Sequence, residues 1–435
     1  MRMTPPPALS LAAVALSALA CSRRPAPTRA PVAHDRPAAA RPAAPASPAA
    51  HAPLLASPTA GVGLGATLRL PAPFHTPSAS NPARLVNRPP DAAPAGPPGT
   101  RVDQWASAKP GGRWLALAPN GDVFLSDHTA GTVSVLRDAD GDGRAEGRFV
   151  FARGLSLPLG MAFHPDGWLY VACTDAVLRF RYAAGQTEAQ GAPERVAALP
   201  GHGYNQHWTR NVLVSADGHT VFVTVGSATN VDVEDDPRRA AISAMSPDGT
   251  HFRPYATGLR NPLGMALHPD TGALYTTVNE RDELGDDLVP DYLTAVREGA
   301  FYGWPFAYFG AHEDPRHAGE RPDLVRAAVV PDLALGAHVA ALGLIFPTRD
   351  GVAPMRGDAL VALHGSWNRS ARVGYKVVCA RFANGRPTGV VEDFLTGFTT
   401  PEGEPWGRPA GLLELGDGSI LVVDDAAGVI WRVHR

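Results

Sequence analysis

The stretch LGMALHPDTGALYTTV, residues 263–278, decides the fold. Two short apolar runs flank a Pro-Asp-Thr-Gly turn, where glycine can take the backbone conformation that a tight turn requires. Runs this short, with β-branched and aromatic side chains in the second, favour strands over a helix. We therefore predict an antiparallel hairpin with strands at residues 265–268 and 274–278.

The same pattern returns along the chain from Trp105 onward. Four further copies are clear, and a less regular one fits residues 341–351 followed by residues 357–367. The clear copies are WLALAPNGDVFLSD (114–127), LGMAFHPDGWLYVA (159–172), VLVSADGHTVFVTV (212–225) and LLELGDGSILVVDD (412–425). Six such units predict an all-β fold, a six-bladed β-propeller of four-stranded antiparallel blades. A sandwich of hairpins is the competing all-β fold, but it does not require the same turn in every unit. No segment has the long helical periodicity of a major helix; PDYLTAVREG (290–299) is at most a short one.

Three regions of the chain differ in composition. Residues 1–21 carry Arg2, an apolar run and then Cys21, which predicts export by a signal peptide. Cys21 directly after Ala-Leu-Ala resembles a bacterial lipobox and predicts a lipid anchor in the periplasm, although the same tripeptide fits an ordinary signal-peptidase site. Residues 22–99 are rich in Pro and Ala and predict a disordered tether, whose last part contains leucines able to pack on the domain. Residues 100–435 form the predicted propeller domain.

Composition excludes some partners. A net charge of −3, with 45% hydrophobic and 19% charged residues, is typical of a globular protein and lacks the basicity that nucleic-acid binding needs. Membrane contact is expected only through the anchor at Cys21. Cys173 and Cys379 stand in strand-like runs, where they can form a disulfide or remain buried thiols.

Charged residues gather around the hairpin with which we began. Arg260 and Asn261 come just before its first strand, and the acidic run Glu280–Asp287 follows its second. Side chains at strand ends commonly build functional sites, whereas charge runs commonly face water, so spacing alone leaves both interpretations open.

Three segments here carry a resemblance to a known family. GLRNP (258–262), NERDELGDDLVPDYL (279–293) and FYGWP (301–305) resemble the glucose/sorbosone dehydrogenase family, whose members oxidise sugars with pyrroloquinoline quinone (PQQ) on a six-bladed propeller. The resemblance extends from about Trp105 to Val433. It implies hydride transfer from a sugar or aldosulose to PQQ, with calcium as a second cofactor and an external electron acceptor as partner.

The resemblance also implies catalytic residues. His207, in GHGYNQHWTRN (201–211), matches the family histidine that takes the proton of the sugar hydroxyl. Glucose-oxidising members orient this histidine with an Asp, whereas Ser227 stands near that position here; Asp232 or Asp235 is a candidate substitute. Arg260 matches the cation that lies near the reactive carbonyl of the quinone, where it stabilises developing negative charge.

Further residues are implied for the cofactors. Asn261 accompanies Arg260, while Arg369 and Arg408 are expected to bind the three carboxylates of PQQ, and His338 resembles a family residue that faces the channel. The side chains expected to hold calcium at the quinone lie in the acidic run, and they are Asp282, Glu283, Asp286 and Asp287.

A second calcium site is suggested by the residues themselves. Asp138, Asp140 and Asp142 alternate, and Gly143 stands at the sixth position, as at the start of an EF-hand loop. Phe149 at the twelfth position excludes a complete EF-hand. A shorter loop closed by Glu146 and an acidic turn without metal are both compatible with this spacing.

Two other functions fit a propeller with these motifs. One is a non-catalytic propeller that binds a partner or a polysaccharide, and the other is a lactonase that hydrolyses its substrate with a metal in the channel. A histidine base beside an arginine, with two further arginines for carboxylates, favours the dehydrogenase over both.

Overall fold

Six antiparallel sheets make up the protein, which confirms the predicted six-bladed β-propeller. The computed structural model describes residues 55–56, 61–201 and 207–435. The predicted signal peptide, Cys21 and residues 22–54 and 57–60 of the predicted tether lie outside these residues. In the part of the chain that is described, no helix has the length and apolar character needed to cross a membrane.

Each blade takes its strands mainly in chain order. The strands of blades 1 to 3, from inner to outer, are β4 (Gly112–Leu117), β5 (Val123–Asp127), β6 (Thr132–Arg137) and β7 (Gly147–Ala152); β8 (Met161–His164), β9 (Trp168–Ala172), β10 (Ala176–Arg181) and β11 (Glu194–Ala198); and β12 (Arg210–Val214), β13 (Val221–Val225), β14 (Ala241–Met245) and β15 (Arg253–Thr257). Those of blades 4 to 6 are β16 (Asn261–Leu267), β17 (Leu274–Asn279), β18 (Pro290–Ala295) and β21 (Leu333–Ala337); β22 (Ala341–Ile345), β23 (Ala359–Leu363), β24 (Lys376–Ala383) and β25 (Arg386–Leu395); and β26 (Pro409–Glu414), β27 (Ile420–Asp424), β28 (Val429–His434) and β3 (Arg101–Ser107).

Each sequence repeat forms the two inner strands of one blade. In the hairpin that opened the sequence analysis, β16 pairs with β17 and Leu267 lies opposite Leu274. The inner strands β4, β8, β12, β16, β22 and β26 contact one another in turn around the ring. Because every inner strand begins at the same face, the residues before it and those after the second strand meet there. We call this the upper face.

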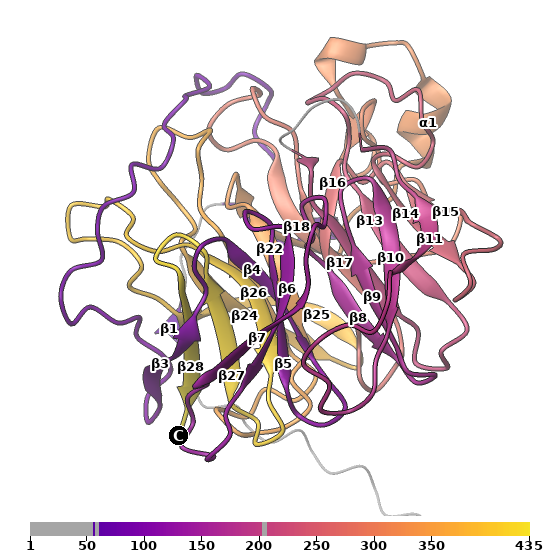
Figure 1. Ribbon diagram of the computed structural model, residues 1–435. Coiled ribbons are helices and arrows are strands. Elements are labelled where there is room, and N and C mark those ends of the chain that lie inside the picture. Colours follow the sequence, from indigo (N-terminus) through magenta and orange to yellow (C-terminus); the bar gives the residue numbers. More distant parts are fainter. Residues whose placement is uncertain (1–54, 57–60, 202–206) are drawn as a thin grey trace, which may run out of the picture. The chain divides into compact units, whose positions relative to one another are not determined.

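The first and last strands of the propeller domain pair with each other and close the ring. β3, the first strand of the domain, pairs with β28 and becomes the outer strand of blade 6, with Arg101 opposite His434 and Ser107 opposite Val429. Figure 1 shows the six sheets around one centre, with the short helix α1 (Pro322–Ala327) standing beside blades 3 and 4.

A long connection leaves blade 4 between β18 and β21. It contains α1, the small hairpin β19 (Ala307–Tyr308) and β20 (His312–Glu313), and a 3-10 turn at Pro315–His317. We call residues 296–332 the blade-4 insertion. The short helix considered for PDYLTAVREG was wrong, because residues 290–295 pair on both sides as β18.

The segment before β3 also lies on the propeller. β2 (Val62–Leu64) adds a fifth strand to blade 4, β1 (Leu55–Ala56) does so for blade 5, and a 3-10 turn covers Gly65–Thr67. The predicted tether boundary at residue 99 is therefore wrong for residues 61–99, whose backbone groups pair with blades 4 to 6.

Apolar side chains fill the spaces between blades. The second strands β5, β9, β13, β23 and β27 are buried along their whole length. Phe124 on β5 meets Phe151 of its own blade, and Phe163 and Tyr182 across the boundary with blade 2, edge-on with ring centroids 5.0–5.4 Å apart. Cys173 and Cys379 are separate buried thiols, and burial raises the pKa of Cys173 to about 12.

In two blades, an aspartate at the end of the second strand accepts hydrogen bonds from backbone amides at the upper face. Asp127 in blade 1 accepts hydrogen bonds from the amides of Gly111 and Ala130. Asp424 in blade 6 accepts from the amides of Arg408 and Ala427. These carboxylates fix the start of the inner strand next to them, and so place Arg408 at the upper face.

Burial raises the pKa of Asp424 to about 6, above the value of about 4 expected in the unfolded chain. The folded protein therefore holds this proton at pH values where the unfolded chain releases it, and the resulting stability is lost as pH rises through 6. Relative to Asp424→Asn, the wild-type free energy of unfolding should fall by about 1–2 kcal/mol between pH 5 and 7.5, measured by urea denaturation.

Asp425→Asn serves as the control for this measurement. Burial would raise the pKa of Asp425, but His364 and Arg113 hold it below its ordinary value, so this carboxylate does not titrate between pH 5 and 7.5. A flat difference for Asp424→Asn across the same range would contradict the prediction.

Candidate functional site

A cavity of about 320 Å³ opens at the upper face, within the size range of small-molecule sites. Its walls come from several blades, because they are built from the starts of inner strands and the ends of second strands. Six residues predicted from the sequence line it, and they are His207, Arg260, Asn261, Asp282, His338 and Arg408.

Four other predicted residues lie outside the cavity wall. Arg369 donates to the Asp287 carboxylate at 2.7 Å and to the carbonyl of Asp286 at 2.6 Å. Asp286 also accepts from the amide and hydroxyl of Ser370, and Glu283 is exposed at a positive φ of 73°. The loops of blades 4 and 5 are therefore joined through Asp286, Asp287 and Arg369, and the acidic run does not gather its carboxylates around one point.

His207 is buried just before the inner strand of blade 3. Its Nδ1 lies 2.9 Å from the hydroxyl and 3.0 Å from the carbonyl oxygen of Ser227. The Ser227 hydroxyl donates to the carbonyl of Thr229 at 2.6 Å, so both Ser227 oxygens act as acceptors toward the histidine. Nδ1 therefore carries the hydrogen, and the lone pair is on Nε2. Ser227 thus fixes the tautomer, the part for which Asp232 or Asp235 was considered as a substitute.

Burial and the nearby Arg260 charge lower the pKa of His207 to about 3. The imidazole is therefore neutral at neutral pH. Arg210, also buried, donates to the carbonyl of His207 at 2.7 Å and holds the backbone of this segment in place.

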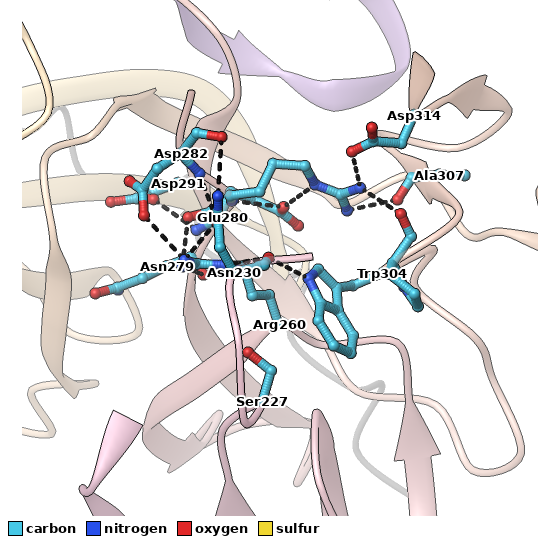
Figure 2. A network of polar contacts seen from close by, with 12 residues as sticks. Ser227, Asn230, Arg260, Asn279, Glu280, Asp282, Asp291, Trp304, Ala307 and Asp314 are labelled. Carbon is cyan, nitrogen blue, oxygen red and sulfur yellow. Dashed lines mark hydrogen bonds and ion pairs between the residues drawn. The ribbon is translucent and has the colours of Figure 1, made fainter. Parts of the chain in front are cut away.

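Arg260 is held by groups from blades 3 and 4, as Figure 2 shows. Its guanidinium donates to the Asp282 carboxylate at 2.9 Å, to the carbonyl of Glu280 at 2.7 Å and to the side-chain oxygen of Asn230 at 2.9 Å. The Asn230 oxygen also accepts from the amide of Asp282 at 3.0 Å. Asn230 thereby fixes the cation and its carboxylate together, and its carbonyl receives the indole N–H of Trp304 at 2.9 Å.

Behind Asp282 lies a fully buried ion-pair network. Arg281 contacts Glu280 and Asp314, each at 3.0 Å, and all three side chains are 0% exposed. Asp314, which Figure 2 labels, belongs to the blade-4 insertion. Arg316 nearby donates to the carbonyl of Asp282 at 3.1 Å. The insertion therefore supports the cavity wall through charge pairs.

His338 approaches Asp282 from the start of blade 5. Its Nε2 lies 2.9 Å from the carbonyl of Gly285, and its Nδ1 lies 3.7 Å from the Asp282 carboxylate. Burial opposes a charge here, but Asp282 and the Gly285 carbonyl raise the pKa of His338 above its ordinary value. Below this pair, Asp291 accepts from the amides of Glu280 and Ala340, and burial raises its pKa.

A second histidine in the cavity has a carboxylate partner. His364, which lines the wall from blade 5, has its Nε2 2.9 Å from Asp425, and Asp425 pairs with Arg113 at 2.6 Å. Nε2 therefore carries the hydrogen, and Nδ1 has the lone pair. Burial and the charge of Arg408 lower the pKa of His364 to about 3.

Arg408 is the least compensated cation of the wall. Its Nε and Nη2 donate to the carbonyls of His364 and Gly365, both at 3.0 Å. Among the described residues no carboxylate lies within ion-pair distance of this guanidinium, whose pKa burial lowers. A buried cation without an anion is unfavourable alone and favours binding of an anionic ligand.

Aromatic rings and unpartnered acceptors complete the wall. Trp367 is 40% exposed, while Trp208 stacks on His128 with ring centroids 4.8 Å apart. Among the described residues, the buried oxygens Asn261 Oδ1 and Glu280 Oε1 have no hydrogen-bond partner. Both residues line the cavity, so a ligand that carries donors would satisfy them.

The other predicted metal loop does bring its carboxylates together. Ligand oxygens of Asp138, Asp140, Asp142 and Glu146 all lie within 4.8 Å of one another. Asp138 also accepts from the amides of Gly141 and Gly143, which holds the loop in its turn. Glu146 therefore closes a loop whose donor atoms are the hard oxygens that calcium prefers.

Sequence reasoning missed residues of the wall, among them Arg113 and Glu280, and two residues that hold wall residues in place, Asn230 and Asp425. Asn230, Glu280 as a wall residue, Asp425 and Arg113 became visible only in three dimensions, because their partners lie 20 to 312 residues away. His364 stood in a motif that was interpreted for its arginine alone.

Comparison with known proteins identifies the family. The chain matches the TrAA12-like family over residues 97–291 and 322–435. The chain belongs to this family. The match confirms the resemblance to PQQ-dependent sugar dehydrogenases from which the site residues were predicted. Residues 292–321, outside the TrAA12-like match, include Trp304, Asp314 and Arg316.

Two curated relatives are similar over most of the chain. An uncharacterised protein of Borreliella burgdorferi is 26% identical over 344 residues, which cover 73% of this chain and 90% of the relative. A protein of Coprinopsis cinerea named PQQ-dependent pyranose dehydrogenase is 26% identical over 387 residues, which cover 74% of this chain. The match covers 52% of that relative, so the TrAA12-like chain spans about half its length.

Solved structures share the fold. The holo PQQ domain of the Coprinopsis cinerea pyranose dehydrogenase has a TM-score of 0.69 at 20% identity, covering 82% of this chain and 100% of that chain. A calcium structure of a Trichoderma reesei family AA12 enzyme has a TM-score of 0.67 at 21% identity, covering 79% and 97%. At these identities the likeness shows the six-bladed architecture alone.

The buried network predicts that Arg281→Met destabilises the TrAA12-like propeller strongly. Removing the cation leaves the buried Glu280 carboxylate without an ion-pair partner among the described residues and leaves Asp314 with Arg316 alone, so the free energy of unfolding should fall by about 3–5 kcal/mol in chemical denaturation. Arg321→Met is the matched control, because Arg321 pairs with Asp323 at 2.7 Å on the exposed side of the same insertion. The control should leave stability close to that of the wild type, because an exposed ion pair contributes little. Equal effects of the two variants would contradict the role of the network.

Proposed function

We propose that this TrAA12-like protein is a PQQ-dependent oxidoreductase that oxidises a small sugar or aldosulose and passes the electrons to an external acceptor. The observation that carries the proposal is Arg408, a half-buried cation of the cavity wall without a carboxylate partner among the described residues. A ligand with several carboxylates matches this charge. The curated Coprinopsis relative, named for the same cofactor, supports the choice of anion.

The residues present fit PQQ. Arg408 would hold a carboxylate through a charge-assisted bond, with Arg113 as a second cation at the same side of the wall. The free Oδ1 of Asn261 would accept from a ring N–H, and Trp367 offers an aromatic face to a flat ligand. When bound, PQQ supplies an acceptor for hydride.

The protein's own groups would handle the proton and the charge. His207, neutral and with its lone pair on Nε2, would take the proton of the sugar hydroxyl. Arg260 is fixed by Asp282 and Asn230, so it provides a positive charge that needs no rearrangement during the reaction. His338 and Asp282 keep this part of the wall charged and ordered.

His364 is the second candidate for the base. The observation in its favour is the Asp425 carboxylate at 2.9 Å, which orients the ring and would stabilise its protonated form. His207 remains our first choice because Arg260 lies beside it, so the proton acceptor and the fixed cation occur together.

We propose calcium at the loop of Asp138, Asp140, Asp142 and Glu146, where oxygen ligands already converge. The expected calcium site in the acidic run is less well supported. Asp282 is compensated by Arg260 and His338, its carbonyl accepts from Arg316, and Asp287 is compensated by Arg369.

Titration with PQQ tests the proposed function. The wild-type protein should bind PQQ and show its reduction on addition of an aldose. Arg408→Ala should weaken binding by about 10- to 100-fold, because one charge-assisted contact is lost, with turnover partly recovered at saturating quinone. Arg321→Ala, on the exposed surface, is the control. If the wild-type protein binds no PQQ, the PQQ-dependent dehydrogenase is excluded and the non-catalytic propeller becomes the favoured function. Metal-dependent hydrolysis of a lactone would instead indicate the lactonase.

Substitution of the two histidines separates the candidate bases. His207→Ala should reduce turnover by about 10²- to 10⁴-fold while PQQ still binds. Asp425→Asn and His364→Ala should leave turnover less affected if His207 is the base. Normal turnover of His207→Ala, together with a collapse in His364→Ala, would reverse the assignment.

Calcium should stabilise the protein through the loop at residues 138–146. Adding calcium to the chelated protein should raise Tm by a few degrees, and Asp138→Asn/Asp140→Asn should abolish this shift because two ligands lose their charge. Asp286→Asn is the comparison for the acidic run. A calcium-induced shift that survives in the double variant but disappears in Asp286→Asn would place the ion at the acidic run.

A further inference from the structure

A segment before the propeller domain crosses the upper face beside the cavity. Residues 74–81, here called the strap, lie between the blade-4 loop at residues 284–287 and the blade-5 loop at residues 366–370. Sequence analysis gave this region no role beyond that of a tether. In Figure 1 the indigo N-terminal segment runs past the loops at this side of the ring.

The strap supplies hydrogen-bond partners for the blade-4 loop. The amide of Gly285 donates to the Ser78 hydroxyl at 3.1 Å, and the amide of Asp286 donates to the Thr76 hydroxyl at 2.8 Å. The amide of Phe74 donates to the carbonyl of Leu284 at 2.8 Å. Contact is close, since a Cβ on Gly285, whose φ is +119°, would lie 2.8 Å from both the carbonyl oxygen and the hydroxyl of Thr76.

The same strap continues to the blade-5 loop. The amide of Asn81 donates to the carbonyl of Trp367 at 2.7 Å, and its side-chain amide donates to the carbonyl of Ser370 at 2.9 Å. Trp367 lines the cavity although its ring is 40% exposed. Its backbone is thus fixed from outside by the strap.

The blade-4 loop contacts a residue of the cavity wall, and the blade-5 loop contributes one. The carbonyl of Gly285, whose amide is held by Ser78, accepts from His338, and His338 lies against Asp282. Trp367 belongs to the wall itself. A group on each of two blades therefore depends on hydrogen bonds from a segment that lies about 200 to 290 residues earlier in the chain.

We propose that Thr76, Ser78 and Asn81 are positioning residues of the cofactor cavity, which hold His338 and Trp367 in place for the ligand. The inference rests on the proposed function, since it takes PQQ as the ligand of the cavity. It assigns to the N-terminal segment a part in cofactor affinity. The three residues act through the two loops and do not line the cavity.

The test compares two sets of substitutions in the same segment. Thr76→Val/Ser78→Ala/Asn81→Ala removes the side-chain contacts of the strap to the loops. Thr67→Val/Thr100→Val is the matched control, because both hydroxyls bond only to carbonyls three residues away. PQQ affinity is measured by equilibrium titration, and hydrogen exchange is measured on the cofactor-free proteins.

The strap variant should bind PQQ about tenfold more weakly and exchange faster in peptides that contain His338 and residues 366–370. The control should change neither, and a strap variant with Thr76→Ser in place of Thr76→Val should recover part of the affinity, because serine keeps the hydroxyl. Unchanged affinity, or faster exchange confined to residues 284–287, would overturn the proposal. If the wild-type protein binds no PQQ, the proposed function fails, and exchange at His338 and residues 366–370 alone decides whether the strap positions the cavity.

Discussion

The convergence of six inner strands on one centre is the constraint on which the rest of the structure depends. Because each inner strand begins at the same face, a residue just before it is carried to the upper face whatever its place in the sequence. His207, Arg260, His338 and Arg408 all stand at such positions. The fold thereby brings together chemistry that is spread over some 200 residues, and loop variation around the ring can change that chemistry without disturbing the blades.

Charge balance explains how so many ionic groups share one small cavity. Asp282 faces Arg260 and His338, Asp425 faces Arg113 and His364, and Arg281 is shared by Glu280 and Asp314. Each of these groups would be costly to bury alone. The pairing removes nearly all of that cost, and Arg408 is left without a carboxylate partner among the described residues.

The predictable parts of this protein are those that depend on local sequence. Alternating apolar residues around Pro-Asp-Gly turns predicted every inner hairpin, since strand and turn preferences act over a few residues. Six cavity residues were predicted because they stand at strand ends in motifs shared with a family. The pairing of Arg369 with Asp287, of His364 with Asp425 and of Asn230 with Arg260 could not be predicted, because such contacts are set by the spatial order of the blades.

The pairing of the N-terminal strand with the last blade sets the order in which the chain can fold. β3 finds its neighbour only when β28 has been made, and β2 and β1 must wait for β21 and β25. During synthesis the segment therefore emerges first and docks last, so its exposed strand edges persist until blade 6 is complete. Contacts this distant in sequence also slow folding, because a long loop must be closed before they form. A chain truncated before blade 6 would thus lack the pairing of β3 with β28 that closes the ring. Strand β3 would then have no neighbour to pair with.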